Sequence, residues 1–506
     1  MNPSSYRPLH DLPPLAGLAT FEEAQRPGLS VEECVRRLKR YHYAFKRLHG
    51  IFLARLTAEP IYELKMAFSL HAHYCAEHTA ALRQRVGEMR EPPLGLDVVP
   101  EAALEIFFDE IQAAPTTVEL LAGLYEKAVP ALLQALQTHA AETNPLADAP
   151  TVRLIKFALL EVKEMRDYGL RALAGLRTSM FDVRCSTFDV QPAAGVDRVE
   201  ENPGTLEARD GRCAGPNVEH RTSNIEHRTA DADAPFDLLN PPALSRQRSA
   251  VPFTYDCVPK RDARFPDPYN MGVNAEAFLY DPSQPAEPKV LMMFYKRLRE
   301  IDVPEMMASI ITETKGQPWG YYRDMTRQLW DEARHAMMGE VGFVSLGVDW
   351  SKVMVNFTWS HGLNTQLTAK ERHGVLYFIE QGLMPKTGKR FEWETAKAAH
   401  STLSTLFQDY DWADEVLHAR VGRDWYVSQF ESPKDAVEYG DRAWSKVLVG
   451  WRQWRDEGLT AHRNWWPDVY TDYCHAQSIQ PDPAVLVFCE TYEQKRADLK
   501  MVSASA

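Results

Sequence analysis

The sequence predicts an all-α fold in which residues 286–430 form a four-helix bundle. Apolar residues recur at helical spacing over most of residues 29–178 and again from about 287 to about 460. The pattern Asp-Glu-x-x-His occurs twice, at 331–335 and 414–418, and a lone glutamate precedes each copy by about thirty residues. An antiparallel helix pair accounts for each half of this pattern, and two such pairs make a bundle.

Residues 1–178 are expected to form a helical N-terminal domain. Its first helix begins after Ser30, a good N-cap residue, and its second ends near Met89, because Pro92 and Pro93 follow. Two further helices are expected near 116–142 and 150–176.

Residues 179–285 are expected to form a long irregular insertion, because they are rich in Pro, Gly, Asp, Asn and Ser. Residues 190–250 expose too little apolar surface to offset the entropy of ordering, so we expect a flexible segment there. Residues 251–285 are expected to be irregular but packed. The repeat NVEHRT-S-NIEHRT contains His220 and His227, which indicate a solvated loop because nothing rigid holds them. A helical extension, residues 431–506, follows the bundle.

Composition narrows the classes of partner. The net charge is -13, and the sequence has no long run of Lys and Arg, so neither nucleic acid nor an anionic membrane is an expected partner. No stretch approaches the roughly 20 apolar residues of a membrane span. The first residues lack a signal-peptide pattern. The seven cysteines are scattered with no CxxC pair, which is typical of reduced thiols. We therefore expect a cytoplasmic protein.

The two Asp-Glu-x-x-His copies supply candidate metal ligands. Glu and His three residues apart lie on one face of a helix, and carboxylate with neutral imidazole suits iron or manganese. Thirty residues separate Glu300 from Asp331, and thirty-three separate Glu380 from Asp414. The expected metal ligands are Glu300, Glu332, His335, Glu380, Glu415 and His418.

The first lone glutamate has an alternative. Gly316, in KGQP, lies midway between Glu300 and Glu332, which places the two carboxylates level across a helical hairpin. Glu305 fits a turn near residue 318, and Pro304 would kink a helix that runs through Glu300. We favour Glu300 and keep Glu305 as the alternative.

The second hairpin is less regular. Its turn signal, residues 385–389, lies close behind Glu380 but far before Glu415, so an extra helical piece is expected near 391–403. The helix that carries Glu380 begins with a capping box formed by Thr368 and Glu371.

Other polar residues are expected beside the ligands. Asp331 and Asp414 are expected to accept the second imidazole N–H and so to fix the tautomer of each histidine. Gln328 and Asp411 lie one helical turn before the two ligand glutamates. Asp411 is either a further ligand or a hydrogen-bond partner.

The N-terminal helices offer a weaker candidate. His71, His73, Glu77 and His78 share one helix, and Glu161 and Glu164 share another. His71 and His73 face different sides of their helix, so structural or surface roles are favoured.

The doubled E-x(about 30)-DExxH pattern resembles that of the ferritin-like di-iron carboxylate superfamily, including the arylamine N-oxygenases and the wider group of di-iron oxygenases. The segments FYKRLREIDVPEMMA and DEARHAMMGE are also similar to uncharacterised bacterial ferritin-like proteins. The resemblance covers about 120 to 130 residues and implies a ferritin-like bundle. The N-oxygenases have an extra histidine one turn before the last ExxH, where this chain has Asp411.

The resemblance implies that the protein is an O2-activating non-haem di-iron oxidase or oxygenase. It would hold two iron ions, with manganese, alone or beside iron, as the alternative. Its partners would be O2, an unknown small organic substrate and, for some reactions, an electron donor. Two interpretations compete with this one. The protein could be non-catalytic, with iron that it stores or transfers or with a structural metal that stabilises the bundle, or the bundle could bind no metal. The substrate and the oligomeric state do not follow from the sequence.

Overall fold

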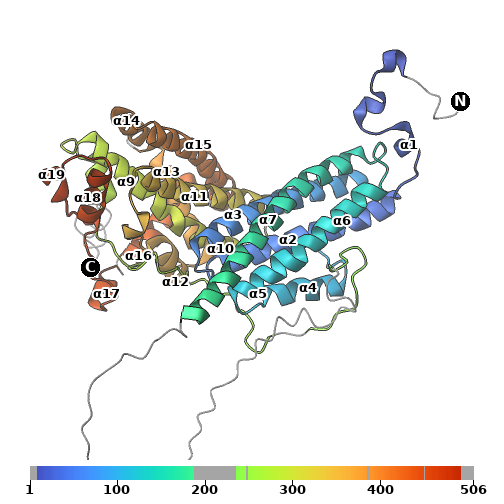
Figure 1. Cartoon of the computed structure of the whole chain (residues 1–506), viewed down its shortest axis with the longest axis horizontal. Coiled ribbons are helices and arrows are strands. Elements are labelled where there is room, and N and C mark those ends of the chain that lie inside the picture. Colours follow the sequence, from blue (N-terminus) through green and yellow to red (C-terminus); the bar gives the residue numbers. More distant parts are fainter. Residues whose placement is uncertain (1–7, 187–234, 247–248, 385–387, 449–450, 492–506) are drawn as a thin grey trace, which may run out of the picture. The chain divides into compact units, whose positions relative to one another are not determined.

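The computed structural model describes residues 8–186, 235–246, 249–384, 388–448 and 451–491. Every regular element in these ranges is helical, which confirms the all-α expectation. The helices separate into two compact units (Figure 1). The first combines residues 1–37 with 99–253, and the second combines residues 38–98 with 254–506.

The first unit is built from helices that bury apolar faces on one another. The regular helices are α1 (Phe21–Ala24), the start of α2 (Val31–Leu56), α4 (Ala102–Gln112), α5 (Thr117–Leu121), α6 (Val129–Glu142) and α7 (Ala149–Ser186), with a π-helical turn at Ala122–Ala128. As expected, Ser30 begins α2, since its Oγ accepts from the backbone N–H of Glu33 at 3.2 Å. The helices expected near 116–142 and 150–176 are present; α4 was not expected.

The end of the insertion corrects a sequence expectation. Residues 190–250 were expected to be flexible, but residues 235–246 pack within the first unit. Phe236, Leu238 and Leu239 are buried, and the Phe236 ring stacks on Phe107 with centroids 4.1 Å apart. This short apolar run inside a polar segment provides the burial that composition alone did not reveal. The tandem repeat with His220 and His227 lies outside the described residues.

The second unit contains the expected bundle region. Its helices are the rest of α2, α3 (Tyr62–Met89), α8 (Ala275–Tyr280), α9 (Ala286–Leu298), α10 (Asp302–Glu313), α11 (Trp319–Ser345), α12 (Leu363–Gln366), α13 (Ala369–Leu383), α14 (Lys389–Ala398), α15 (Thr402–Trp425), α16 (Pro433–Leu448), α17 (Trp451–Asp456), α18 (Trp466–Ala476) and α19 (Pro483–Leu486). A 3₁₀ turn, Arg299–Ile301, joins α9 to α10. Residues 254–274 are irregular but packed, as expected, with Phe265 and Val273 buried. The expectation of an irregular segment over 179–285 was wrong at its ends, because α7 continues to Ser186 and Ala275–Tyr280 form α8.

The domain boundaries expected from the sequence followed chain order, with residues 1–178 as one domain. The compact units do not follow that order, because α3 packs along α11 and belongs with residues 254–506. Hydrophobic periodicity identifies a buried helix face but not the helix that covers it.

Four helical segments pack around the candidate ligands: α9–α10, α11, α13 and α15. The turn between α10 and α11 contains Gly316 with φ +77°, a conformation that favours glycine. The capping box of Thr368 and Glu371 is present at the start of α13. The extra helical piece expected near 391–403 is α14, which packs against both α15 and α9.

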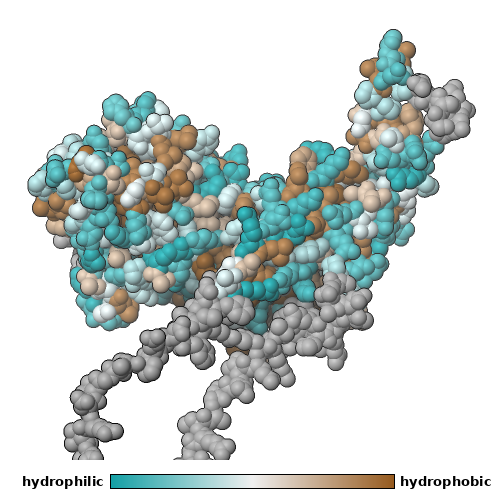
Figure 2. Space-filling view, viewed as in Figure 1, coloured by the Kyte–Doolittle hydropathy of each residue, from teal (hydrophilic) through white to brown (hydrophobic). Residues whose placement is uncertain are grey.

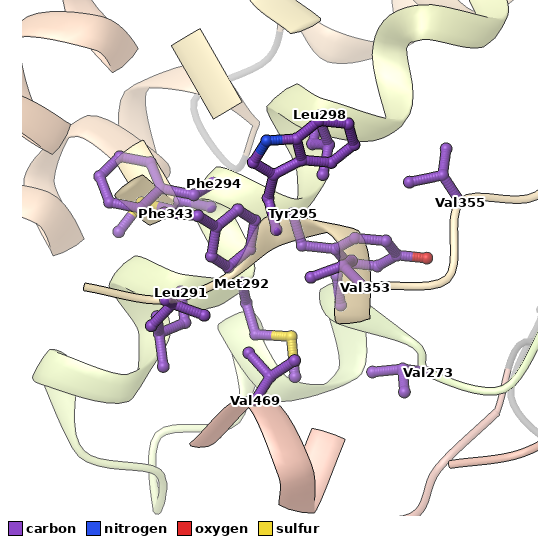
Figure 3. Packing of buried hydrophobic residues seen from close by; sticks show 14 of the residues in the cluster. Val273, Leu291, Met292, Phe294, Tyr295, Leu298, Phe343, Val353, Val355 and Val469 are labelled. Atoms are coloured by element: carbon purple, nitrogen blue, oxygen red, sulfur yellow. The ribbon is translucent and has the colours of Figure 1, made fainter. Parts of the chain in front are cut away.

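A large apolar cluster supports this arrangement from one side. Figure 3 shows Met292 of α9 beside Val469 of α18, and Phe294 of α9 beside Phe343 of α11. The two phenylalanine rings meet edge to face with centroids 6.2 Å apart. The C-terminal helices thus help to fix the position of α9.

The surfaces of both units display hydrophobic side chains among hydrophilic ones (Figure 2). The exposed examples include Phe157 and Leu160 on α7 and Leu406 and Val416 on α15. Across the ranges that the structure covers, no helix has the length and apolar character needed to span a membrane.

Candidate metal centre

The structure brings all six expected ligand residues together inside the second unit. Glu300, Glu332 and His335 offer ligand atoms within 4.8 Å of one another. Glu332, Glu380, Glu415 and His418 form a second such group. Glu332 belongs to both groups, and a third group of His335, Asp411 and Glu415 adjoins them, so the clustered atoms could hold adjacent cations.

The helices explain how each side chain reaches this centre. Glu332 and His335 share one face of α11, and Glu415 and His418 share one face of α15. Glu380 comes from α13, and Glu300 from the 3₁₀ turn before α10. Pro304 does not kink a continuous helix, because α10 begins at Asp302 and proline is tolerated in a first turn.

Two glycines allow the backbones to approach closely beside the ligands. A Cβ on Gly339 would overlap the backbone of Leu298, two residues before Glu300. A Cβ on Gly422 would overlap the ring of Tyr377, which precedes Glu380 by one turn. Each glycine lies four residues after a ligand histidine, so the repeated unit is longer than DExxH and reads DExxHxxxG.

The ligand atoms are buried without hydrogen-bond partners. These atoms are Glu300 Oε2, Glu332 Oε1, His335 Nδ1, Glu380 Oε2, Glu415 Oε2 and His418 Nδ1. An unsatisfied buried polar atom costs about 1–3 kcal/mol, and more when charged. Each of the six residues contributes one such atom to the same small volume, which is the arrangement a bound cation would satisfy.

Each histidine faces an aspartate from the opposite helix. His335 Nε2 on α11 lies 3.1 Å from Asp414 Oδ2 on α15, and His418 Nε2 lies 3.5 Å from Asp331 Oδ2. Arg334 joins the two aspartates, since its Nη2 contacts Asp331 and lies 2.7 Å from Asp414 Oδ2. The crossed pairs leave Nδ1 of both imidazoles facing the glutamates.

Asp411 is held by two buried cations. The ammonium of Lys389 donates to both of its oxygens at 2.8 and 2.9 Å, and Arg297 also contacts it. Lys389 lies 2.8 Å from Glu415 as well, and Arg297 lies 2.9 Å from Glu300. Asp411 Oδ1 is 3.5 Å from His335 Nδ1, so it borders the centre while it pairs with Lys389 and Arg297.

Gln328 is also placed beside the centre. Its side chain is buried, and its Nε2 donates to Glu380 Oε1 at 3.3 Å. This donor restrains Glu380, which, like Glu332, has only histidine partners among the described ion pairs.

The charges at the centre do not balance. Seven carboxylates gather there: Glu300, Glu332, Glu380, Glu415, Asp331, Asp411 and Asp414. Three cationic side chains contact them: Arg297, Arg334 and Lys389. With neutral histidines the excess is four negative charges, which equals the charge of two divalent ions. Arg327 also contacts Asp331, but its side chain is 42% exposed and water screens it.

The protonation equilibria reflect this excess. Burial alone would lower the pKa of His335, but Asp414, Glu300 and Glu332 outweigh burial and raise that pKa to about 10. Burial, together with Glu415 and Glu332, raises the pKa of Glu380 well above its usual range. Protons thus supply part of the positive charge that the seven carboxylates require, as a bound cation would.

Glu305, the alternative to Glu300, lies in a different network. Its carboxylate pairs with Lys65 at 2.8 Å and with Arg261 at 3.0 Å, and it is fully buried. Arg261 also contacts Asp302. Glu305 is absent from the cation-binding groups found among the described residues. The geometry therefore favours Glu300 for the first site.

The histidines of α3 do not form a comparable cluster. Within the part of the chain that the structure describes, His71, His73 and His78 belong to no group of converging ligand atoms, and neither do Glu161 and Glu164 on α7.

Sequence reasoning missed Arg297, Arg334 and Lys389. Arg334 lies inside the first DExxH copy, and Lys389 follows the PKTG turn. A signal was available only for Gly339 and Gly422, because aligning the two DExxH copies reveals a glycine at the same position in each. Comparisons with models of protein families, with curated proteins and with solved structures found no match.

Proposed function

We propose that this chain is an O2-activating non-haem di-iron oxidase or oxygenase that acts on a small organic substrate, with a ferritin-like bundle as its scaffold. The observation that carries the proposal is the pair of ligand groups that share Glu332. Four glutamates and two ExxH histidines on a helical bundle are the ligand set of ferritin-like di-iron and di-manganese proteins.

The residues fit two divalent ions. Glu300, Glu332 and His335 would hold one ion, and Glu380, Glu415, His418 and the shared Glu332 would hold the other. The unsatisfied ligand atoms and the excess of four negative charges both support this assignment. When bound, two iron ions would supply the electrons that reduce O2.

The remaining residues orient and insulate the centre. Asp414 orients the His335 ring, Asp331 faces His418 at the longer distance of 3.5 Å, and Arg334 contacts both aspartates. The ligand atoms of all six residues are buried, which keeps bulk water from them. Lys389 and Arg297 pair with Asp411, which also lies in a candidate cation group with His335 and Glu415, so Asp411 stays either a further ligand or a partner of these cations.

The test begins with metal content. The full chain, purified without metal and loaded anaerobically, is expected to bind two Fe(II) per chain by elemental analysis. Glu332→Ala removes the shared ligand and should reduce the stoichiometry, whereas Glu340→Ala, which also lies on α11 but outside both ligand groups, should keep it at two. Fewer than two Fe(II) per loaded chain would count against the proposal.

Reaction with O2 separates an enzyme from an iron store. Stopped-flow mixing of the loaded protein with O2 is expected to give a transient change in visible absorption. Desalting should then recover protein with both irons still bound, because buried glutamates and two imidazoles hold them. Oxidation of many Fe(II) equivalents per chain, with ferric mineral accumulating, would replace the oxygenase with an iron-handling protein.

A further inference from the structure

The first unit contains a separate group of converging ligand atoms. Cys34 on α2, His139 on α6 and Asp148 at the start of α7 are all buried, and their Sγ, Nε2 and Oδ2 atoms face one another. Cys34 Sγ lies 3.4 Å from Asp148 Oδ2 and 3.9 Å from His139 Nε2. His139 Nε2 lies 3.5 Å from Asp148 Oδ2.

The sulfur–oxygen and nitrogen–oxygen distances, 3.4 and 3.5 Å, match the edges of a tetrahedral metal site, and the sulfur–nitrogen distance of 3.9 Å is a few tenths of an ångström longer. Zinc binds sulfur at about 2.3 Å and imidazole nitrogen or carboxylate oxygen at about 2.0–2.2 Å, so tetrahedral angles place neighbouring ligand atoms about 3.4–3.6 Å apart. The nitrogen–oxygen separation is longer than the roughly 2.7–3.2 Å of an N–H···O hydrogen bond. One imidazole nitrogen faces both partners, which differs from a nucleophilic triad, where the two ring nitrogens face different partners.

The surrounding structure fixes the loop that carries the carboxylate. Thr143 Oγ1 donates to Asp148 Oδ2 at 3.0 Å, in the manner of groups that orient a metal ligand. Asn144 Nδ2 donates to the backbone oxygen of Ala24 at 2.9 Å. Gly28, with φ +67°, lies so close to Asn144 that a Cβ would overlap its backbone nitrogen. The three ligand side chains therefore come from a preorganised setting.

We propose that Cys34, His139 and Asp148 form a mononuclear site for a zinc-like divalent cation, distinct from the glutamate and histidine centre. Thiolate and imidazole favour zinc over magnesium or calcium, and three protein ligands leave a fourth position for water. Binding releases the Cys34 proton to solvent and forms a metal–sulfur bond, and the metal keeps its oxidation state. Burial and Asp148 raise the pKa of the metal-free Cys34 thiol to about 11, so the cation must displace that proton.

Cobalt(II) tests this site without interference from the other. Only a sulfur ligand gives a cobalt–thiolate charge-transfer band, and the glutamate and histidine centre has none. The full chain with Co²⁺ is expected to develop this band up to one equivalent and to lose it when Zn²⁺ is added. Cys34→Ser should abolish the band, whereas Cys474→Ser, which removes a buried thiol of the second unit, should leave it intact.

A second variant keeps the test decisive if Cys34→Ser does not fold. His139→Gln retains the thiol and is expected to weaken Co²⁺ binding at least tenfold, with helix content checked by circular dichroism. Glu332→Ala, which disrupts the other centre, should still bind one Zn²⁺. No thiolate band in the folded chain, or a band that survives Cys34→Ser, would overturn the site whatever the outcome at the glutamate and histidine centre.

Discussion

Exchanging Glu300 and Glu305 for glutamine, one at a time, separates a metal ligand from a structural ion pair. The two residues are five positions apart, yet Glu300 faces His335 and Glu305 faces Lys65 and Arg261. We expect Glu300→Gln to reduce metal binding and Glu305→Gln to leave two metal ions per chain. Glu305→Gln should instead lower stability with and without metal.

The structure gives the size of that loss. Removing one partner of a buried ion pair costs about 3–5 kcal/mol, and Glu305 leaves Lys65 with no other carboxylate among its described ion pairs. Burial would raise the pKa of Glu305, but Arg261 and Lys65 hold it at about 2 instead of 4.5. That depression corresponds to about 3 kcal/mol at neutral pH, which agrees with the first figure.

The sign of the pH dependence follows from the lowered pKa. Glu305 stabilises the fold fully above the unfolded value of 4.5, and this contribution disappears as the pH falls towards 2. Glu305→Gln should therefore flatten the acid dependence of stability between those values. At neutral pH its thermal midpoint should fall by roughly 6–12 °C, at about 2–4 °C per kcal/mol.

The assay is differential scanning calorimetry with and without added metal, paired with elemental analysis. For Glu300→Gln we expect a smaller rise in thermal midpoint on adding metal than for the unmodified chain. For Glu305→Gln we expect a lower thermal midpoint without metal, and the same rise in that midpoint on adding metal as for the unmodified chain. Loss of metal by Glu305→Gln, or two bound ions and the full rise in thermal midpoint for Glu300→Gln, would refute the assignment of Glu300 as the metal ligand.

Four further outcomes are expected. Arg334→Leu should weaken metal binding by about 10–100-fold, as for other groups that orient ligands, and titration calorimetry giving unchanged affinity would contradict this role. Gly339→Ala should lower the thermal midpoint, because its Cβ would overlap the Leu298 backbone. The control Gly382→Ala has open space around its Cβ and should leave stability unchanged or raise it by up to about 1 kcal/mol. Equal changes in thermal midpoint for the two variants would refute the close approach at Gly339. Lys389→Met should destabilise the metal-free chain and enlarge the metal-dependent rise in midpoint, so an unchanged rise in calorimetry would remove Lys389 from the charge balance. Phe236→Ala should cost about 3–5 kcal/mol in denaturant unfolding, and a loss below about 1 kcal/mol would show that residues 235–246 contribute little to the first unit.

The helical elements near the centre could be predicted from local signals. The capping box of Thr368 and Glu371, the Gly316 turn and the need for α14 each depend on a few neighbouring residues or on chain length. The position of the turn midway between Glu300 and Glu332 was enough to predict that the two side chains lie opposite each other across the helical hairpin. Local rules therefore sufficed for the hairpin that carries Glu300 and Glu332, whereas the doubled DExxH pattern, and not a turn position, predicted that Glu380 and Glu415 join them.

The groups around the ligands could not be predicted in the same way. Asp414 faces His335 on the other helix, not the histidine of its own DExxH copy, and this crossing depends on how α11 and α15 pack. Lys389 reaches Asp411 because α14 folds back beside α15 and is tied to α9 by the ion pair of Glu392 with Lys296. Such contacts depend on tertiary packing, which a single sequence without helix partners does not specify.

The charge balance links these missed residues to the expected ones. The six ligands alone carry four negative charges, so they could suit two divalent ions whatever surrounded them. The three aspartates nearby would add three more charges and bind the ions too tightly or attract extra cations. Arg297 and Lys389 pair with Asp411, and Arg334 pairs with both Asp331 and Asp414, so three cations offset three aspartates and leave the excess at four. The buried cations would therefore match the centre to the two divalent ions proposed above, while they hold the aspartates beside the imidazoles.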